Sequence, residues 1–410
     1  MAKQIRLFSS AVRNEKLSIQ KQLLRRCIKN GTRLSDALEK QGWTYDDLQY
    51  ETSNALPVEM TKYFTLADFQ RKKNRVPVVS FFAGAGGLDL GLEASGFSHV
   101  ALVEKNELFC NTLRFNRPKL KVIGPPLASG DVSETDSLVS QLEALIGAPP
   151  FDGVFVGGPP CQPFSIAANQ RFSKSGDNFK RVGFSHATNG NLLFEYIALI
   201  KHFKPRAFLI ENVPGLIDID GGEQLQRAYR ELESVGYNVH QPSVLIAAEY
   251  SVPQNRTRLF VVGNRTGASF VPPRPSGHQL ACASVFNISL DGIANHETRE
   301  HSAESVTRYM SLDFGERDQL GRVDRLDPSL PSKTVIAGGS AGGGRSHLHP
   351  YAPRTLSVRE SARIQTFPDE YVFVGSSARQ FTQVGNAVPP VLGVQLGNAL
   401  YDSFFRKPRR

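Results

Sequence analysis

Apolar residues follow two different rhythms along this chain. In residues 17–29 and 34–41 they recur at the three- and four-residue spacing of amphipathic helices, and Asp46 and Asp47 favour the start of a third helix. From residue 76 onward, short apolar runs alternate with helix-like stretches. Strands separated by helices predict an α/β fold with a doubly wound, mostly parallel sheet. The apolar runs occupy residues 76–82, 99–104, 151–158, 206–213 and 258–263.

This rhythm stops after the last of these runs. Between residues 264 and 325, arginines are scattered among prolines, serines and short apolar runs, which indicates a small inserted domain. Helical spacing returns at 357–367 and 391–405, and we expect the last helix to pack back on the sheet. The chain therefore has four predicted parts: a helical, basic N-terminal extension (1–74), an α/β domain (75–263), the small domain (264–356) and a C-terminal return to the α/β domain (357–410).

The N-terminal extension looks like a separate appendage, joined through the basic run RKKNR at residues 71–75. We therefore expect a chain that lacks residues 1–74 to fold and to keep its function. Two roles stay open for the extension: packing against the rest of the protein, or autoregulation as a helix-turn-helix regulator of transcription.

The composition favours a globular protein with a polyanionic partner. Hydrophobic residues make up 40% of the 410 residues and charged residues 21%, and the formal net charge is +9. The four cysteines form no C-x-x-C pair, so we expect neither a disulfide framework nor a zinc site, and a reduced, cytoplasmic setting. We expect no signal peptide and no membrane span, because no apolar run approaches ~18 residues.

A glycine-rich turn follows the first apolar run. Gly84, Gly86 and Gly87 lead into an amphipathic helix, and glycines at such a turn let the backbone approach a ligand at the helix N-terminus. Glu104 closes the next strand, where a carboxylate is placed to hold ribose hydroxyls. An NAD-binding site has the same outline, but Asp89 occupies the place of the third glycine in G-x-G-x-x-G. The motif therefore predicts a nucleotide-like cofactor.

A cysteine follows another predicted strand, in the segment GGPPCQPFS at residues 157–165. Catalytic groups of open α/β sheets lie at the carboxyl ends of strands, where this segment falls. Pro160 and Pro163 stiffen the loop around Cys161 and fix the direction of its thiol. Most single cysteines are small buried hydrophobes. We expect that ordinary role for Cys27, Cys110 and Cys282.

Charged side chains are predicted at the same sheet edge. Glu211 ends the apolar run 206–213, so its carboxylate faces the edge that carries Cys161. Arg256 and Arg258 begin the next run, and side chains two residues apart share one face of a strand. We therefore expect both guanidiniums to point into one site. Solvated surface charges are the ordinary alternative at each position.

Together, these segments resemble the DNA cytosine-C5 methyltransferases. The family's motifs occur here in the family's order, from FAGAGG at 82–87 to QVGNAVPP at 383–390, and the match spans residues 76–405. The resemblance implies the S-adenosylmethionine-dependent methyltransferase fold and a DNA (cytosine-5-)-methyltransferase of the bacterial restriction–modification type. The intervening motifs are PCQPFS at 160–165, ENV at 211–213, QNRTR at 254–258 and RESARIQTFPD at 359–369.

The resemblance also implies the roles of single residues. Cys161 would attack C6 of a flipped-out cytosine, Glu211 would hold the edge of the base, and Arg256 and Arg258 would brace its carbonyl. S-adenosylmethionine, without a metal, would be bound by Phe82, Ala83, Gly84, Gly86, Gly87, Leu88, Glu104, Lys105, Asp131, Val132, Pro159, Asn386 and Ala387. DNA would be contacted by Gln162, Ser165, Gln254, Arg299 and Arg322.

The inserted domain would be the target-recognition domain, in which several arginines read guanine edges or contact phosphates. The implied partners are double-stranded DNA and a separate cognate restriction endonuclease, and we expect a monomer. An RNA cytosine methyltransferase is the alternative substrate class; Gln162 and the long inserted segment count against it. The arginines of the insert are Arg265, Arg274, Arg299, Arg308, Arg317, Arg322 and Arg325.

Two local patterns are set aside. GGSAGGGRS at residues 338–346 is close to a phosphate-binding P-loop, but Arg345 replaces the required lysine, and we interpret it as a flexible loop near DNA. His347 and His349 suggest a metal, but without a third ligand they are interpreted as surface residues.

Overall fold

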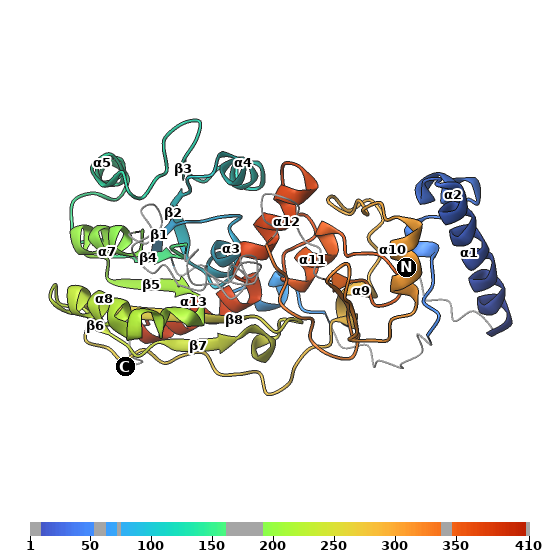
Figure 1. Ribbon diagram of the computed structural model, residues 1–410. Helices are drawn as coiled ribbons and strands as arrows, with labels where there is room; N and C mark the ends of the chain where they lie inside the picture. The colour runs from blue at the N-terminus through green and yellow to red at the C-terminus, as the bar shows by residue number, and fades with distance from the viewer. Residues whose placement is uncertain (1–9, 53–62, 72–74, 161–191, 338–346, 407–410) are drawn as a thin grey trace. The chain divides into compact units, whose positions relative to one another are not determined.

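The computed structural model describes residues 10–52, 63–71, 75–160, 192–337 and 347–406 (Figure 1). The chain forms two compact units. The small unit contains residues 1–65, 251–256 and 277–386, and the sheet unit contains residues 66–250, 257–276 and 387–410. The domain boundaries predicted at residues 74, 263 and 356 stay a prediction, because the division of the chain into compact units does not show which residues contact DNA.

The sheet unit is built on one mixed sheet with the strand order β3-β2-β1-β4-β5-β8-β6, and β7 also pairs with β8. Strands β1 to β5 run parallel to one another, while β8 is antiparallel to β5, β6 and β7. The predicted doubly wound, mostly parallel sheet is confirmed. The strands are β1 (Pro77–Phe81), β2 (Ser98–Val103), β3 (Val122–Ile123), β4 (Val154–Gly157), β5 (Ala207–Asn212), β6 (Asn238–Val239), β7 (Ser243–Ile246) and β8 (Thr257–Asn264).

The order of these strands determines where a ligand can bind. From β1 the chain moves to β2 and β3 on one side and then returns to β4 on the other side of β1. In open α/β sheets, ligands bind beyond the carboxyl ends of the strands at such a reversal. The glycine turn after β1 and the loop after β4 both begin at this point.

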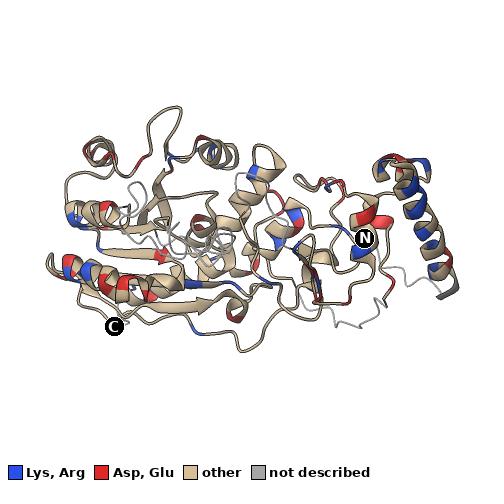
Figure 2. Cartoon of the chain, viewed as in Figure 1, with Lys and Arg blue, Asp and Glu red and all other residues tan. Residues whose placement is uncertain are grey.

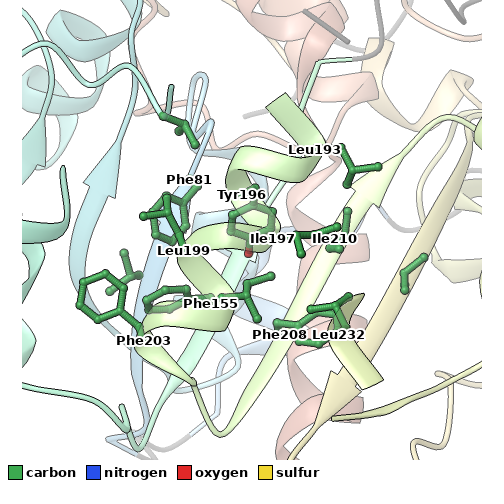
Figure 3. Close-up of a cluster of buried hydrophobic side chains, with 14 of the residues drawn as sticks. Phe81, Phe155, Leu193, Tyr196, Ile197, Leu199, Phe203, Phe208, Ile210 and Leu232 are labelled. Atoms are coloured by element: carbon green, nitrogen blue, oxygen red, sulfur yellow. The ribbon is translucent and has the colours of Figure 1, made fainter. Parts of the chain in front are cut away.

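One face of the sheet is covered by α5 (Thr135–Ile146), α7 (Leu192–Phe203) and α8 (Glu223–Glu233), which share one hydrophobic cluster with the strands. Figure 3 shows α7 lying over Phe155 of β4 and Phe208 of β5, both without exposed surface. Burying a large side chain of this kind stabilises the fold by about 1.5–3 kcal/mol. Strands β4 and β5 therefore carry the functional loops from a fixed base.

Alternate residues of the strands point to the opposite face of the sheet. Leu102 of β2 packs with Cys110 and Leu113 of α4 (Glu107–Asn116), whereas its neighbours in β2 face the cluster under α7. The last helix, α13 (Pro390–Phe404), packs along α3 (Gly87–Ala94) rather than directly on the sheet as expected.

Glycine makes the contact between α3 and α13 possible. A Cβ at Gly91 would overlap the carbonyl oxygen of Pro390 and the backbone of Gly393, and one at Gly397 would overlap the hydroxyl of Ser95. The two backbones therefore meet without intervening side chains. The sheet unit also contains the single turns η2 (Leu66–Phe69), η3 (Pro214–Leu216), η4 (Ile219–Gly222) and η5 (Ala247–Tyr250).

The small unit combines helices with a three-stranded sheet of order β11-β10-β9. The predicted helix at 357–367 is α11, and Ser357 caps it by accepting a hydrogen bond from the amide of Glu360. The predicted third N-terminal helix is only the turn η1 (Tyr45–Asp47). The other elements are α1 (Ser10–Asn30), α2 (Leu34–Lys40), α9 (Ala283–Phe286), α10 (Ala303–Met310), β9 (Arg317–Asp318), β10 (Val323–Arg325), β11 (His347–Leu348), α11 (Val358–Ile364) and α12 (Ser377–Asn386).

The N-terminal helices are not a separate appendage. Leu23, Leu24 and Cys27 of α1 share one hydrophobic cluster with Val306 and Met310 of α10, which lies within the inserted segment. The cluster also contains Leu34, Leu38, Tyr45, Leu48 and Ala303. Because the two segments bury each other's apolar surface, the prediction of an independent extension is wrong.

A buried arginine joins the same two segments. Arg325, which is 1% exposed, donates to Thr52 Oγ1 at 2.7 Å and to the carbonyl of Pro350, and it lies 3.5 Å from the ring centre of Tyr50. Burial lowers the pKa of the guanidinium to about 10. Arg325 is therefore not one of the arginines that are accessible to DNA. Because residues 1–74 take part in these contacts, their removal is expected to disrupt the small unit.

Replacement of Leu24 by alanine tests this shared core. Leu24 is 2% exposed, so Leu24→Ala should lower the free energy of unfolding of the small unit by about 2–5 kcal/mol. Ile19→Ala on the same helix is the control, because Ile19 is 38% exposed and its loss should cost under about 1 kcal/mol. Urea unfolding measures both. Equal effects of the two substitutions would contradict a shared core at α1.

Candidate functional site

The turn after β1 is held in a conformation that suits glycine. Gly84 and Gly86 have φ angles of 57° and 73°, in the left-handed region, and Gly86 directly precedes α3. The amide of Gly86 donates to the carbonyl of Ala83 at 2.8 Å. Gly84 is partly exposed, whereas Gly86 and Gly87 are buried, so a ligand can approach the backbone of this turn at Gly84.

Glu104 joins this turn to the end of β2. Its Oε2 accepts a hydrogen bond from the amide of Gly84 at 2.8 Å, and its Oε1 accepts one from the amide of Asn106 at 2.7 Å. Burial raises the pKa of the carboxyl group, while these amides and that of Lys105 oppose the rise. A carboxylate offers about four acceptor positions. Glu104 thus fixes the turn and keeps acceptor capacity for a ligand hydroxyl.

Two more predicted cofactor residues pair with each other beside Glu104. Lys105 donates to Asp131, which also accepts from the amide and hydroxyl of Ser133 at 3.1 and 2.8 Å. Burial alone would raise the pKa of Asp131, but the bonds from Lys105 and Ser133 lower it. Asp131 is therefore an ionised acceptor at this edge, and the next residue, Val132, is buried. Phe82 packs edge-on against Tyr196.

The aspartate that replaces the third glycine has a structural partner. Asp89 of α3 is 1% exposed and lies 2.9 Å from Nε2 of His99 at the start of β2. Nδ1 of His99 lies 3.3 Å from Glu93. Burial lowers the pKa of His99, but the two carboxylates outweigh it and raise the pKa to about 9. The protonated imidazole thus holds α3 to β2. The sequence analysis did not predict this pair, although the sequence shows Asp89 on an expected helix and His99 ten residues later.

Glu211 and Arg258 form the central ion pair of the site. Nε of Arg258 lies 2.9 Å from Oε1 of Glu211, and both side chains are about 15% exposed. Glu211 belongs to β5 and Arg258 to β8, which pair in antiparallel register. A Cβ at Gly158 would lie 2.7 Å from Oε2 of Glu211, so the loop after β4 passes directly against this carboxylate.

The loop that leads to Cys161 is also fixed from β5. The side-chain amide of Asn212 donates to the carbonyl of Pro159 at 3.4 Å, and the oxygen of that amide accepts from Val213. Strand β4 ends at Gly157. Cys161, Gln162 and Ser165 lie outside the described residues, so their predicted roles stay predictions.

Arg256 has surroundings different from those expected. It lies before the first residue of β8 and belongs to the small unit, so it does not share a strand face with Arg258. It is 1% exposed and donates to the carbonyls of Val335 and Gly385 at 3.2 and 2.8 Å. The expectation that both guanidiniums follow one strand face is therefore wrong, because the strand begins one residue later.

Gln254 is also enclosed in the small unit. It has no exposed surface; its Nε2 donates to Gln365 and its Oε1 accepts from the amide of Val335, both at 2.8 Å. A side chain without exposed surface cannot touch DNA in this conformation. Gln254 instead hydrogen-bonds to Gln365, the residue that follows α11, and to Val335.

The predicted DNA-contacting arginines separate into two groups. Arg265 donates to the carbonyl of Pro205, while Arg308 and Arg317 pair with Asp318 and Asp324. Arg274, Arg299 and Arg322 are exposed, as is the paired Arg317. The exposed group is available to a large ligand.

Asn386 is exposed at the end of α12 and Ala387 is buried at the first position of the following sheet-unit segment.

The structure places one of the two remaining sequence patterns. His347 is 4% exposed and its Nε2 lies 3.1 Å from the carbonyl of Thr334, so it is a buried residue of β11 and not a surface one. The P-loop-like segment 338–346 lies outside the described residues. Within the described ranges, no group of three or more His, Cys, Asp and Glu is placed to hold a metal, and no helix is long and apolar enough to cross a membrane.

Comparisons with known proteins agree with one another. The family model described as C-5 cytosine-specific DNA methylase matches residues 76–281 and 281–402. The Type II methyltransferase M.PspPI of a Psychrobacter species is 32% identical over 96% of this chain and 95% of its own length. M.Eco47II of Escherichia coli is 32% identical over 80% of this chain and 79% of its own. The match to M.PspPI therefore includes most of the N-terminal region.

Solved structures show the same fold. A protein encoded within an Escherichia coli prophage superposes with a TM-score of 0.65 at 24% identity and covers 80% of this chain and 99% of its own. The methyltransferase EhMeth of Entamoeba histolytica gives 0.56 at 16% identity over the same shares.

The Asp89–His99 pair predicts a specific pH dependence. Because the pKa of His99 in the folded protein is raised from its ordinary value of 6.5 to about 9, its stabilising effect is complete below pH 6.5 and is lost as the pH rises through 9. This rise corresponds to roughly 3 kcal/mol. His99→Gln should therefore destabilise most at pH 6 and least near pH 9.5 in urea unfolding. His202→Gln, which removes a half-exposed imidazole, is the control; a pH-independent deficit for His99→Gln would contradict the assignment.

Proposed function

The chain belongs to the family of C-5 cytosine-specific DNA methylases, and we propose that it methylates C5 of a flipped-out cytosine through a covalent bond between Cys161 and C6. As a DNA (cytosine-5-)-methyltransferase of restriction–modification type, it uses S-adenosylmethionine and acts on DNA. The covalent step, the flipping of the base and the roles of single residues are the proposal.

The chemistry explains the need for a thiolate. Carbon 5 of cytosine is a weak nucleophile, and attack of a thiolate on C6 makes C5 an enamine-like carbon that accepts a methyl group. Loss of the C5 proton then allows β-elimination, which breaks the bond from C6 to sulfur and frees Cys161. A base inside a duplex cannot reach such a group, so the cytosine leaves the stack at a cost of a few kcal/mol.

The observation that carries the proposal is the pair Glu211–Arg258 beside the loop after β4. Both groups lie at the strand ends where α/β enzymes place catalysis, and Gly158, three residues before Cys161, passes against the carboxylate. We assign the contact with N3 and the amino group of cytosine to Glu211 and the contact with the base carbonyl to Arg258. Before the base enters, each charge compensates the other.

The cofactor is assigned to the glycine turn and the groups around it. S-adenosylmethionine supplies a methyl group on an electrophilic sulfonium. Glu104 keeps acceptor capacity for the ribose hydroxyls, Asp131 offers an ionised acceptor to the adenine amino group, and Gly84 leaves the turn partly exposed. As the family resemblance implies, we also assign to the cofactor Phe82, Ala83, Gly87, Leu88, Lys105, Val132, Pro159, Asn386 and Ala387.

The biological setting follows from the relatives. The named relatives are Type II methyltransferases, and we propose that this enzyme protects host DNA from a separate cognate restriction endonuclease in the cytoplasm, and that it acts as a monomer. Bisulfite sequencing of DNA from cells that express the protein tests the activity and identifies the methylated sequence. Methylated RNA with unmethylated DNA would favour the alternative substrate.

We assign sequence recognition to the exposed arginines of the small unit, and first to Arg322. It lies in the turn between β9 and β10, where the amide of Gly321 donates to Asp318 at 2.6 Å and Arg308 pairs with the same carboxylate. Leu320 in this turn is 76% exposed. Because these contacts with Asp318 hold the turn in place while its tip is exposed, the turn suits contact with a groove of DNA.

Cys161→Ser should lower methyl transfer by several orders of magnitude while leaving cofactor binding intact, because serine is not ionised near neutral pH. Cys282→Ser is the control: its thiol is buried and donates to the carbonyl of Asp327, a bond that a hydroxyl can keep. Tritium transfer to duplex DNA measures both. Comparable rates for the two variants would refute the nucleophile.

Gly158→Ala should lower kcat by roughly 10–100-fold, because the new methyl group displaces the Glu211 carboxylate from its position. The free energy of unfolding should change little, since the atom that yields is the end of a flexible side chain. In a Glu211→Ala background the same substitution should cost no further activity. An additive loss in the double variant would mean that Gly158 acts through another group.

Arg322→Ala should relax selection at one base pair by about 1–3 kcal/mol if the guanidinium reads a base edge. Bisulfite sequencing of a random-sequence library gives the methylated sequence directly. Arg274→Ala, which removes an exposed arginine of the sheet unit, is the control. An unchanged methylated sequence in the Arg322 variant would remove this turn from recognition.

A further inference from the structure

We propose that the outward face of α1 binds the phosphate backbone of duplex DNA outside the methylated sequence. The proposal rests on the DNA methylase function assigned above and adds a second contact surface to it. The surface, called the α1 cationic face from here on, consists of Lys21, Arg25, Arg26 and Lys29.

Packing determines which side chains of α1 face outward. Gln20, Leu23, Leu24 and Cys27 are buried, and the first of them exchanges hydrogen bonds with the backbone of Gln49 at 2.8 and 3.0 Å. The inward face is therefore fixed along the last three turns of the helix. Residues on the other side of the helix, at three- and four-residue spacing, are exposed as a consequence.

The charge on the exposed side is of one sign. Over its 21 residues α1 has a single carboxylate, Glu15, and six cations: Arg13, Lys16, Lys21, Arg25, Arg26 and Lys29. Figure 2 shows Lys and Arg along most of this helix. Arg13 and Lys16 are used internally, because they bind the carbonyl of Tyr50 and the carboxylate of Asp47.

The rest of the cations are available to a partner. Lys21 pairs with Glu51 at 2.9 Å, and both side chains are more than 40% exposed, so this contact is easily exchanged. Among the described residues, Arg25, Arg26 and Lys29 have no ion-pair partner. A merely solvated helix face usually intersperses Glu with Lys one turn apart, whereas here Lys21, Arg25 and Lys29 follow one another at that spacing and repel.

Neutral donors accompany the cations. Asn14, Ser18 and Gln22 are exposed on the same side of α1, and amide and hydroxyl groups of this kind bind phosphate oxygens together with Lys and Arg. Phosphate contacts add affinity to any sequence and carry no sequence information. The α1 cationic face is therefore assigned to affinity and not to specificity.

The structure does not favour the alternative use of this region as a helix-turn-helix reader. In that motif the second helix enters the major groove. Here the second helix, α2, has seven residues and exposes Asp36 and Glu39, which phosphates would repel. The cationic helix is α1, and the hydrophobic cluster that it shares with α10 holds it within the small unit.

The test uses the full chain with Arg25→Ala, Arg26→Ala and Lys29→Ala combined. Fluorescence anisotropy gives Kd for two duplexes with the methylated sequence, a short one that ends at the site and a long one that extends ~15 base pairs on each side. On the long duplex the slope of log K against log salt should fall by up to about 2.7, since each lost phosphate contact removes about 0.9. Affinity at 0.1 M salt should fall about tenfold or more. On the short duplex, affinity and methylation should be unchanged.

The control combines Lys119→Ala, Lys121→Ala and Lys204→Ala, which removes the same charge from exposed lysines that precede β3 and β5 at the amino ends of the sheet. Equal salt slopes of wild type and the α1 variant on the long duplex overturn the proposal, even when the short duplex is methylated normally. An equal loss in the α1 variant and the control also overturns it, because that loss reflects net charge alone. Failure of wild type to methylate the short duplex contradicts the proposed function itself, which separates the two.

A different occupant is distinguished in the same series. Val12, Ile19 and Ile28 are 38–46% exposed on α1, and a basic helix with apolar residues can also bind an anionic bilayer. Binding of wild type to vesicles of phosphatidylglycerol, lost in the α1 variant while DNA binding stays the same, would assign the face to a membrane surface and overturn the DNA contact.

Discussion

The meeting of α3 and α13 without side chains is the contact on which the sheet unit depends. Helix α3 follows the glycine turn to which we assign the cofactor, and α13 is the last helix among the described residues. A Cβ at Gly91 would overlap the backbone of Pro390 and Gly393, and a Cβ at Gly393 would lie 3.0 Å from the carbonyl oxygen of Leu88. Such a close approach fixes the position of α3, and with it the start of the turn that Glu104 holds from the other side. The end of the chain thus determines the geometry of its first motif.

The charges of the sheet unit follow a common physical rule. Burying a charge is unfavourable unless a partner compensates it. Asp89 is compensated by His99, Asp131 by Lys105, and Glu211 by Arg258. The first pair is inaccessible and supports the fold, whereas the last remains about 15% exposed at the strand ends, where the proposed function has a base replace one partner of the ion pair.

Local sequence patterns predict the sheet unit well and the small unit poorly. Strands β1, β2, β4, β5 and β8 bury short runs of apolar residues, and Glu211 lies near the end of such a run, so both are visible without knowledge of the fold. Arg256, two residues before Arg258, has the same local appearance but different surroundings, because its partners are carbonyl groups 79 and 129 residues away. The same limit applies to Gln254 and Arg325. Contacts between distant segments decide such positions, and a single sequence does not show them.

The small unit is built from segments that lie far apart in the sequence, and this affects how the chain folds during synthesis. Leu23, Leu34 and Leu38 leave the ribosome about 270 residues before α10, the helix that covers them, and at roughly 5–20 residues per second this interval is on the order of tens of seconds. During that time a nascent chain exposes an apolar surface beside a strongly basic helix. Newly made protein should therefore depend on chaperones that hold the N-terminal helices, and ribosome-bound fragments that stop before residue 303 should aggregate more readily than complete chains.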